Sequence, residues 1–331
     1  MRKILKFENV YISKTASVVG KSESEGPLKE YFDMLENDLY FGEQSWEMAE
    51  AEMAHRCLSI LMAKSAVKPD DIDLLSGGDL LNQCISTSFA VRDTGIPFLG
   101  LYGACSTAAE SLIVGAAFLE NGFANRVITF ASSHFCSAEK QYRFPLEYGG
   151  QRTPTAQNTV TGTGAFMLEH EGEIKVEDAL IGRIIDNGTA DANNMGAAMA
   201  TAAVDTILRY FDESEKQPSD FDIIATGDLG REGYELACEL FKRKSLNISD
   251  KFTDCGMLIY DIDKQDMHAG GSGCGCSAVV TAGLFYDKLL KGEAKNILLV
   301  GTGALLSQTS ALLNKSIPSV AHLVHLSGGN K

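Results

Sequence analysis

Short apolar segments alternate along the chain with longer segments whose hydrophobic residues recur at helical spacing. The apolar segments are typical of buried strands, and the longer segments are typical of helices. Expected strands lie at Phe7–Ser13, 72–77, Arg126–Ala131, 159–168, Ile174–Ile185, 221–226 and Asn296–Gly301, and expected helices include Ser45–Ala63 and Met195–Phe211. Strands that alternate with helices in this way favour parallel pairing and a layered α/β fold.

Two blocks of sequence occur twice, in the same order. "DDIDLLSGGDL" at 70–80 resembles "SDFDIIATGDL" at 219–229, and residues 104–132 resemble residues 275–303. The second pair aligns Cys105 with Cys276, each at the start of an expected helix. Two matched blocks in one order indicate an internal duplication. We therefore divide the chain into a first half, 1–170, and a second half, 171–331.

The helices that follow Cys105 and Cys276 are apolar or small on nearly every face. A helix of this composition belongs in a core that is packed on both sides. Two halves that each contribute a sheet and one wholly buried helix predict a five-layered α-β-α-β-α fold, with the buried helices in the middle layer.

Charge and composition exclude several classes of protein. The chain has 331 residues with 29 Lys and Arg against 44 Asp and Glu, a formal net charge of −15, which argues against nucleic acid and anionic lipid as partners. No apolar stretch is long enough to span a membrane, and the N-terminus lacks the features of a signal peptide. Eight scattered cysteines make a disulfide framework unlikely, so we expect a cytosol-like compartment.

Several motifs resemble the thiolase and ketoacyl synthase superfamily, in which a cysteine opens the buried helix of the first half. They are "GDLLNQ" at 78–83, "YGACST" at 102–107, "RFPLEYGGQRTPTAQNTVTGTGA" at 143–165 and "AGGSGCGCSAVVT" at 269–281. Within that superfamily they are similar to a family of sporulation proteins that bind pyridine-2,6-dicarboxylate (dipicolinic acid). The resemblance covers about residues 7–325 and implies the thiolase-like five-layered fold.

The resemblance also implies a function and partners. It implies binding of dipicolinic acid and support of its uptake into the developing spore, together with membrane proteins of the same sporulation operon. The protein would then lie peripherally on the cytoplasmic side of the forespore inner membrane. It implies a homodimer that pairs through the apolar segment 96–103, and no cofactor, while leaving open whether calcium accompanies the ligand.

Cys105 is the first candidate site residue. A cysteine at a helix N-terminus meets unpaired amides and the positive end of the helix dipole, so we expect the pKa of its thiol to fall below the free value. The alternative is a buried structural thiol. His134, after the next strand, is a candidate for binding a carboxylate or holding a thiolate, and the alternative is a loop histidine with a structural partner. His268, before a glycine-rich turn, is a candidate catalytic residue. Thiolases have a catalytic histidine before a comparable turn, but the proline and the spacing of that motif are absent here.

The remaining candidates surround Cys105 in the expected fold. Asp79, in the repeated "GDL", contributes either to the pocket or to the N-cap of the next helix. Ser133, which follows the expected strand Arg126–Ala131, is a further ligand-binding candidate. The segment 133–158 is expected to be an inserted loop that covers the Cys105 end of the sheet or contacts a second subunit. Its candidate ligand-binding residues are Arg143, Glu147 and Arg152, since arginine forks match carboxylates in two-point contact.

Two functions remain open from the sequence. The first is a binding protein for the dicarboxylate, and the second is an acyltransferase with Cys105 as the acyl-carrying nucleophile. The second cysteine of thiolases is missing from "VGTGALLS" at 300–307, and the His-Asn pair of ketoacyl synthase III is not recognisable. "CGC" at 274–276 lacks the spacing of a zinc site, so we expect no metal site. The incomplete catalytic set favours the binding protein.

Overall fold

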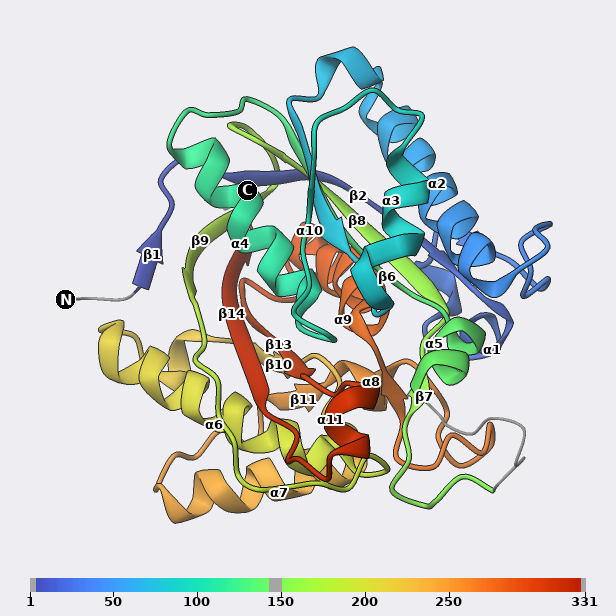
Figure 1. The fold of residues 1–331 in the computed structure, drawn as a ribbon. Helices are drawn as coiled ribbons and strands as arrows, with labels where there is room; N and C mark the ends of the chain where they lie inside the picture. Colours follow the sequence, from blue (N-terminus) through green and yellow to red (C-terminus); the bar gives the residue numbers. More distant parts are fainter. Residues whose placement is uncertain (1–3, 143–150, 329–331) are drawn as a thin grey trace.

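A mixed sheet of twelve strands runs through the protein (Figure 1). The computed structural model describes residues 4–142 and 151–328. The main strands are β2 (Tyr11–Val19), β4 (Leu74–Gly78), β5 (Phe98–Gly100), β6 (Val127–Ser133) and β8 (Gly162–Glu169) in the first half, and β9 (Ile174–Leu180), β10 (Ile223–Thr226), β11 (Phe252–Asp254), β13 (Asn296–Ala304) and β14 (Ser319–Gly328) in the second. The short strands are β1 (Ile4–Lys6) and β3 (Met34–Leu35) in this sheet, and β7 (Asn158–Thr159) and β12 (Gly271–Ser272), which pair separately.

The strand order reveals the duplication. It runs β11-β10-β13-β14-β9-β2-β8-β6-β4-β5, so that in each half the first main strand lies innermost, followed outward by the fifth, fourth, second and third. The two halves of the sheet join where β2 and β9 pair over two residues, Tyr11 with Lys175 and Ile12 with Ile174.

The helices form three layers around the two halves of the sheet. They are α1 (Lys21–Ser24), α2 (Trp46–Ser65), α3 (Ile85–Val91), α4 (Thr107–Glu120), α5 (Phe135–Tyr142), α6 (Met195–Glu213), α7 (Gly230–Arg243), α8 (Cys255–Leu258), α9 (Cys274–Val280), α10 (Tyr286–Lys291) and α11 (Gln308–Leu312). Short 3₁₀ turns lie at η1 (Lys29–Tyr31), η2 (Pro69–Asp71), η3 (Asn82–Cys84) and η5 (Pro218–Asp220), and the π-helical segment η6 (Thr281–Phe285) connects α9 directly to α10. Helix α4 contacts strands of both halves and also α9, so these two helices form the central layer. Helix α2 covers the outer face of the first half and α6 that of the second (Figure 1). The expected five-layered fold is therefore confirmed.

Close packing at the centre depends on glycines. A Cβ atom on Gly164 of β8 would lie 2.4 Å from the carbonyl carbon and oxygen of Ala278 in α9, so the strand and the buried helix approach more closely than any side chain allows. The central hydrophobic cluster includes Leu112 and Phe166, both fully buried. This packing fixes the position of the α4 N-terminus, and with it that of Cys105.

Several boundaries differ from the sequence expectation. Strand β2 begins at Tyr11 and not at Phe7, because the chain bends between β1 and β2, and the Phe7 amide donates to the Glu177 carbonyl of β9 at 3.0 Å. Strand β9 ends at Leu180, and the apolar residues after it are exposed: Ile181 is 53% and Ile184 58% exposed. Helix α2 begins at Trp46, with the Ser45 hydroxyl accepting from the Met48 amide as the N-cap.

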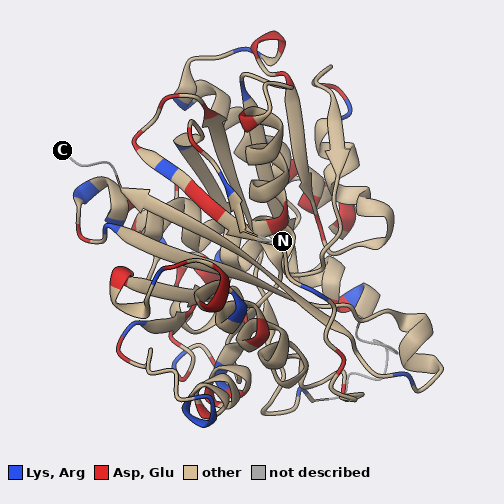
Figure 2. Cartoon of the chain, turned by 90° about the vertical axis from the view of Figure 1, so that its left-hand side faces the viewer, with Lys and Arg blue, Asp and Glu red and all other residues tan. Residues whose placement is uncertain are grey.

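Charged residues lie mainly on the outer helices and loops. On the face seen in Figure 2, acidic and basic residues are interspersed, and the long strands at the centre are largely uncharged. Among the described residues no helix combines the length and the apolar character needed to cross a membrane.

Candidate functional site

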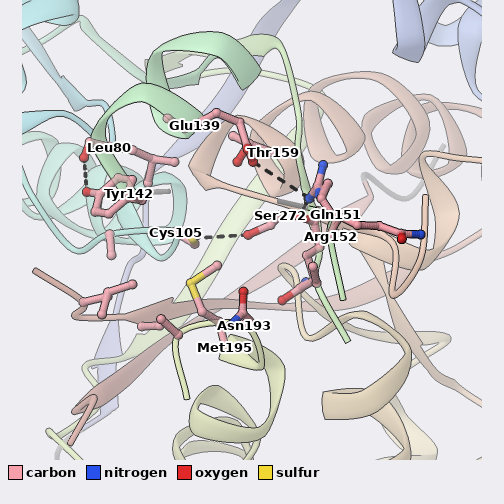
Figure 3. A pocket seen from close by; sticks show the side chains of 17 residues that line it. Leu80, Cys105, Glu139, Tyr142, Gln151, Arg152, Thr159, Asn193, Met195 and Ser272 are labelled. Atoms are coloured by element: carbon pink, nitrogen blue, oxygen red, sulfur yellow. Dashed lines mark hydrogen bonds and ion pairs between the residues drawn. The ribbon is translucent and has the colours of Figure 1, made fainter. Parts of the chain in front are cut away.

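Cys105 lies at the wall of a cavity of about 240 Å³ between the two halves (Figure 3). The first half contributes the start of α4, helix α5 and the segment that leads into β7, and the second half contributes the segment before α6, the β12 turn and the end of β13. The lining residues are Leu80, Ala104, Cys105, Ala138, Glu139, Tyr142, Gln151, Arg152, Ala156, Gln157, Thr159, Ala192, Asn193, Met195, Ser272, Ala304 and Leu306.

The backbone at Cys105 is tightly constrained. Ala104 has a φ of 51°, a left-handed conformation that side chains rarely adopt, and α4 begins at Thr107. The amides of Ser106 and Thr107 donate to the carbonyls of Gly103 and Ala104 at 3.1 and 3.2 Å. These two amides therefore donate hydrogen bonds within the turn. From the sequence we expected the first amides of this helix to donate to a bound group.

The Cys105 thiol faces a buried carboxyl group. Its Sγ atom lies 3.9 Å from Ser272 Oγ, and Ser272 Oγ donates to Asp228 Oδ2 at 3.1 Å (Figure 3 draws the first contact). Burial and the nearby Asp228 carboxylate raise the pKa of Cys105 well above its usual value. This corrects the expectation that the helix N-terminus lowers that pKa, because loss of solvent outweighs the helix dipole here.

Asp228 does not line the cavity but contacts the lining residue Ser272, and the sequence reasoning missed both residues. Its carboxylate also accepts from the Gly273 amide at 2.9 Å and from Thr302 Oγ1 at 2.7 Å. Burial raises its pKa to about 7, opposed by hydrogen bonds from Cys105, Gly273 and Thr302. The repeated "GDL" marked both Asp79 and Asp228, and we assigned a site role only to the copy in the same half as Cys105.

Asp79 itself does not line the cavity. Its buried carboxylate accepts from the Leu81 amide at 2.8 Å and from the Thr87 amide and hydroxyl at 2.7 and 2.8 Å. These bonds hold the turn that leads into α3, close to the alternative role as a helix cap. The side chain is thus used within its own half.

His134 and Ser133 also point away from the cavity. The His134 ring contacts the Leu39 carbonyl at 2.8 Å and accepts from the Cys136 amide at 3.1 Å, and burial lowers its pKa to about 4. Strand β6 ends at Ser133, whose hydroxyl donates to the Val160 carbonyl at 2.7 Å. Helix α5 begins directly afterwards, which turns both side chains into the protein interior.

His268 lies outside the cavity lining as well. Its Nδ1 atom is 2.8 Å from the Thr153 carbonyl oxygen, and its Nε2 atom is 3.9 Å from the exposed Asp266 carboxylate. Its backbone φ is 53°, which directs the ring toward the segment before β7. Within the described residues, no histidine lines the cavity and no group of three or more His, Cys, Asp or Glu is arranged to hold a metal ion.

Arg152 is the predicted loop residue that does reach the cavity. It is the one cation among the described lining residues, and its guanidinium lies 4.0 Å from the Glu139 carboxylate and over the Phe135 ring. The other two predicted loop residues, Arg143 and Glu147, lie outside the described residues. The segment 133–158 is not wholly a loop, because its first part forms α5.

The chain matches one protein family over nearly its whole length. The family model of stage V sporulation protein AD matches residues 2–327. Stage V sporulation protein AD from Bacillus subtilis (strain 168) is 40% identical over 314 residues, which cover 95% of this chain and 93% of that protein. The chain belongs to the stage V sporulation protein AD family.

Two solved structures illustrate the similarity of this fold to known ones. 3-Oxoacyl-[acyl-carrier-protein] synthase III from Aquifex aeolicus VF5 covers 96% of this chain and 99% of its own at a TM-score of 0.58 and 12% identity. A variant of OleA from Xanthomonas campestris covers 98% and 99% at a TM-score of 0.62 and 13% identity. At these identities the likeness establishes the thiolase-like fold of this stage V sporulation protein AD family member and nothing about its chemistry. The chemistry has to be inferred from the residues of the site.

Proposed function

We propose that the protein binds pyridine-2,6-dicarboxylate in the Cys105 cavity and supports the uptake of this ligand into the developing spore. The proposal rests on the residues that line this cavity. Its lining combines Arg152 and the polar side chains of Gln151, Thr159 and Asn193 with the apolar side chains of alanine, leucine and methionine residues. A flat aromatic dianion needs donors at its carboxylates and an apolar surface for its ring, because buried charge must be paired.

The size of the cavity also favours a small ligand. Its volume of about 240 Å³ lies below the range of about 300–1,000 Å³ that is usual for pockets of drug-sized ligands. An acyl chain on a pantetheine arm needs a longer tunnel, whereas a single substituted pyridine ring does not.

The charged residues of the cavity set a condition for the binding of a dianion. Glu139 lies 4.0 Å from Arg152, so an arriving dianion competes with this carboxylate for the guanidinium. Binding therefore requires Arg152 to turn from Glu139 toward the ligand, or Glu139 to take up a proton. Either event makes dicarboxylate affinity sensitive to the charge of residue 139.

The second candidate function is acyl transfer, and the observation that favours it is Cys105 at the head of the buried helix in a condensing-enzyme fold. A condensing enzyme needs a thiolate and groups that handle the proton and the oxyanion. Here burial and Asp228 hold the thiol in its neutral form, and no described histidine lines the cavity. The binding function accounts for these features with fewer assumptions.

Calorimetry on purified variants tests the proposal. We expect Cys105→Ser to keep most of the affinity, because the thiol lines the cavity without forming a covalent bond, and Cys105→Trp to abolish binding by filling the space. Arg152→Gln should cost about 2–5 kcal/mol of binding free energy, tens- to thousands-fold in Kd. Arg92→Gln, which removes an exposed arginine that does not line the cavity, is the matched control.

Intact-mass analysis after incubation with acyl-coenzyme A separates the two functions. The binding function predicts an unchanged mass, with circular dichroism confirming that each variant is folded. If the folded wild type gives no heat with the dicarboxylate and gains an acyl group on Cys105, the acyltransferase function replaces the binding function.

We further propose that the protein works as a homodimer beside membrane proteins of the same sporulation operon, on the cytoplasmic side of the forespore inner membrane. Strand β5 is an edge strand of the sheet, and Leu99 in it and Tyr102 after it are 39% and 43% exposed. An exposed apolar edge of this kind needs a cover, which a second copy would supply.

Whether calcium enters with the ligand is tested by repeating the dicarboxylate titration with and without calcium.

A further inference from the structure

The cavity arginine stands at one end of a chain of hydrogen bonds. Arg152 Nη1 donates to Asn158 Oδ1 at 2.5 Å. Asn158 Nδ2 donates to the Tyr260 hydroxyl at 3.4 Å, and that hydroxyl donates to Glu23 Oε1. Every donor points in the same direction, so the chain ends at the Glu23 carboxylate, which is its final acceptor.

Glu23 is fully enclosed by the protein. Its side chain is 1% exposed, Oε1 also accepts from the Thr161 amide at 3.0 Å, and Oε2 has no partner among the described residues. Tyr260 is the titratable side chain that contacts it. Lys21 and Glu25, its charged neighbours on α1, are exposed.

A buried carboxylate without a cation beside it is unfavourable, and glutamine would fill the same space without the charge. Burial raises the pKa of Glu23 to about 7, although hydrogen bonds from Tyr260 and Thr161 oppose the shift. The carboxyl group therefore changes its charge close to neutral pH. A role that depends on this charge explains its position better than packing does.

We propose that Glu23 is a positioning residue for Arg152. Its carboxylate holds the proton of the Tyr260 hydroxyl, so that the hydroxyl oxygen accepts from the Asn158 amide nitrogen. The amide oxygen of Asn158 then faces the guanidinium and, together with the Gln157 carbonyl that accepts from Arg152 Nη2, fixes it at the cavity wall. Protonation of Glu23 weakens the first of these bonds, because a neutral acid is a poorer acceptor than a carboxylate, and the arginine loosens.

This arrangement predicts a particular pH profile for anion binding. Arginine stays charged throughout, so Arg152 itself contributes no change between pH 6 and pH 8, and ionisation of the nearby Asp228 would only weaken anion binding as the pH rises. With Glu23 as the final acceptor, affinity rises as pH increases through about 7. The prediction rests on the proposed function only in its choice of ligand.

The first experiment measures pyridine-2,6-dicarboxylate affinity by calorimetry at pH 6 and pH 8. The wild type should bind about five- to tenfold more tightly at pH 8, a coupling of ordinary size for linked sites. Glu23→Gln and Tyr260→Phe should both remove this difference and bind at pH 8 about as weakly as the wild type binds at pH 6. Their combination should add little. Glu25→Gln, the same change at an exposed position of α1, should behave like the wild type.

The second experiment needs no ligand. Exchange of arginine protons with solvent is base-catalysed, so its rate normally increases with pH. In protein labelled with ¹⁵N-arginine, the Nη protons of Arg152 should exchange more slowly at pH 8 than this increase predicts. These protons are assigned by their absence from Arg152→Gln. This protection should be lost in Glu23→Gln and Tyr260→Phe.

The outcomes of the two experiments are distinct. Absence of dicarboxylate binding in the wild type would remove the proposed function, and Arg152 exchange would still decide the role of Glu23. If exchange protection at Arg152 is the same in wild type and both variants, Glu23 does not position Arg152. A rise in affinity from pH 6 to pH 8 that persists in folded Glu23→Gln would overturn the inference in the same way.

Discussion

Replacing Asp228 with asparagine should change how the stability of the fold depends on pH. Asp228 is fully buried between the two halves, where it accepts from Ser272 Oγ, the Gly273 amide and Thr302 Oγ1. Burial raises its pKa from 3.8 to about 7. The neutral acid is therefore the form that the fold prefers, and the ionised form, which predominates above pH 7, is disfavoured.

The sign and the size of the effect follow from the two pKa values. Because the folded pKa lies above the unfolded one, the titration of Asp228 stabilises the fold below about pH 4, and this contribution is lost as the pH rises to about 7. Each pH unit between these values is worth about 1.4 kcal/mol, so the full loss is about 4 kcal/mol. The Asp228→Asn variant has no carboxyl group at this position, so its stability does not undergo this loss. Whatever the constant cost of the amide, the free energy of unfolding of the variant relative to wild type should rise by about 4 kcal/mol from pH 4 to pH 8.

Urea unfolding of both proteins at intervals from pH 4 to pH 8.5 measures this difference, and taking the difference cancels the titration of the other groups. Asp250→Asn, at an exposed aspartate, is the matched control. A carbon-detected NMR titration of the Asp228 carboxyl group gives its pKa directly. A stability difference that stays constant over the whole range would show that Asp228 ionises at its usual pH, and the reasoning from burial would fail.

Three further predictions concern the cavity and the subunit edge. Cys105 should react with iodoacetamide at pH 7.5 more than about tenfold slower than free cysteine, because burial and Asp228 disfavour its thiolate; rapid labelling seen by mass spectrometry would contradict this. Glu139→Gln should tighten dicarboxylate binding about three- to tenfold in calorimetry, since it removes a like charge near Arg152; equal or weaker affinity would argue against an anion there. Light scattering at micromolar concentration should give the mass of a dimer, and a uniform monomer would rule out pairing through β5 under those conditions.

The sequence predicted the architecture because the evidence for it is local and occurs twice. The apolar helices after Cys105 and Cys276 identified the central layer directly, and the matched blocks identified the two halves. Strand ends were less accurate, as at Phe7, because burial and strand pairing are different properties. Phe7 is buried and its amide bonds to β9, but the chain bends before β2 begins, and hydrophobicity alone does not report where a bend divides an apolar segment.

The sequence predicted the site less completely, for a physical reason. Placing His134 and Ser133 after a strand identified the correct edge of the sheet but not the direction of the side chains, which the start of α5 decides. Arg152 reaches the cavity because the segment before β7 lies against β12. Asp228 was missed because a cavity between duplicated halves takes groups from both copies. Both copies of "GDL" accept hydrogen bonds within their own half, and Asp228 in addition faces Cys105 of the opposite half.

The pairing of Cys105 with Asp228 bears most directly on chemistry. A condensing enzyme gains from a neighbour that stabilises a thiolate, and a carboxylate does the opposite. Protonation of Asp228 below pH 7 would remove its negative charge, but burial is the larger cause of the raised thiol pKa and would remain. The thiol is therefore neutral whichever form Asp228 takes. On a fold shared with condensing enzymes, this combination favours a cavity wall that accepts a ligand without attacking it, and the charge that recognises the ligand must come from elsewhere, with Arg152 the described candidate.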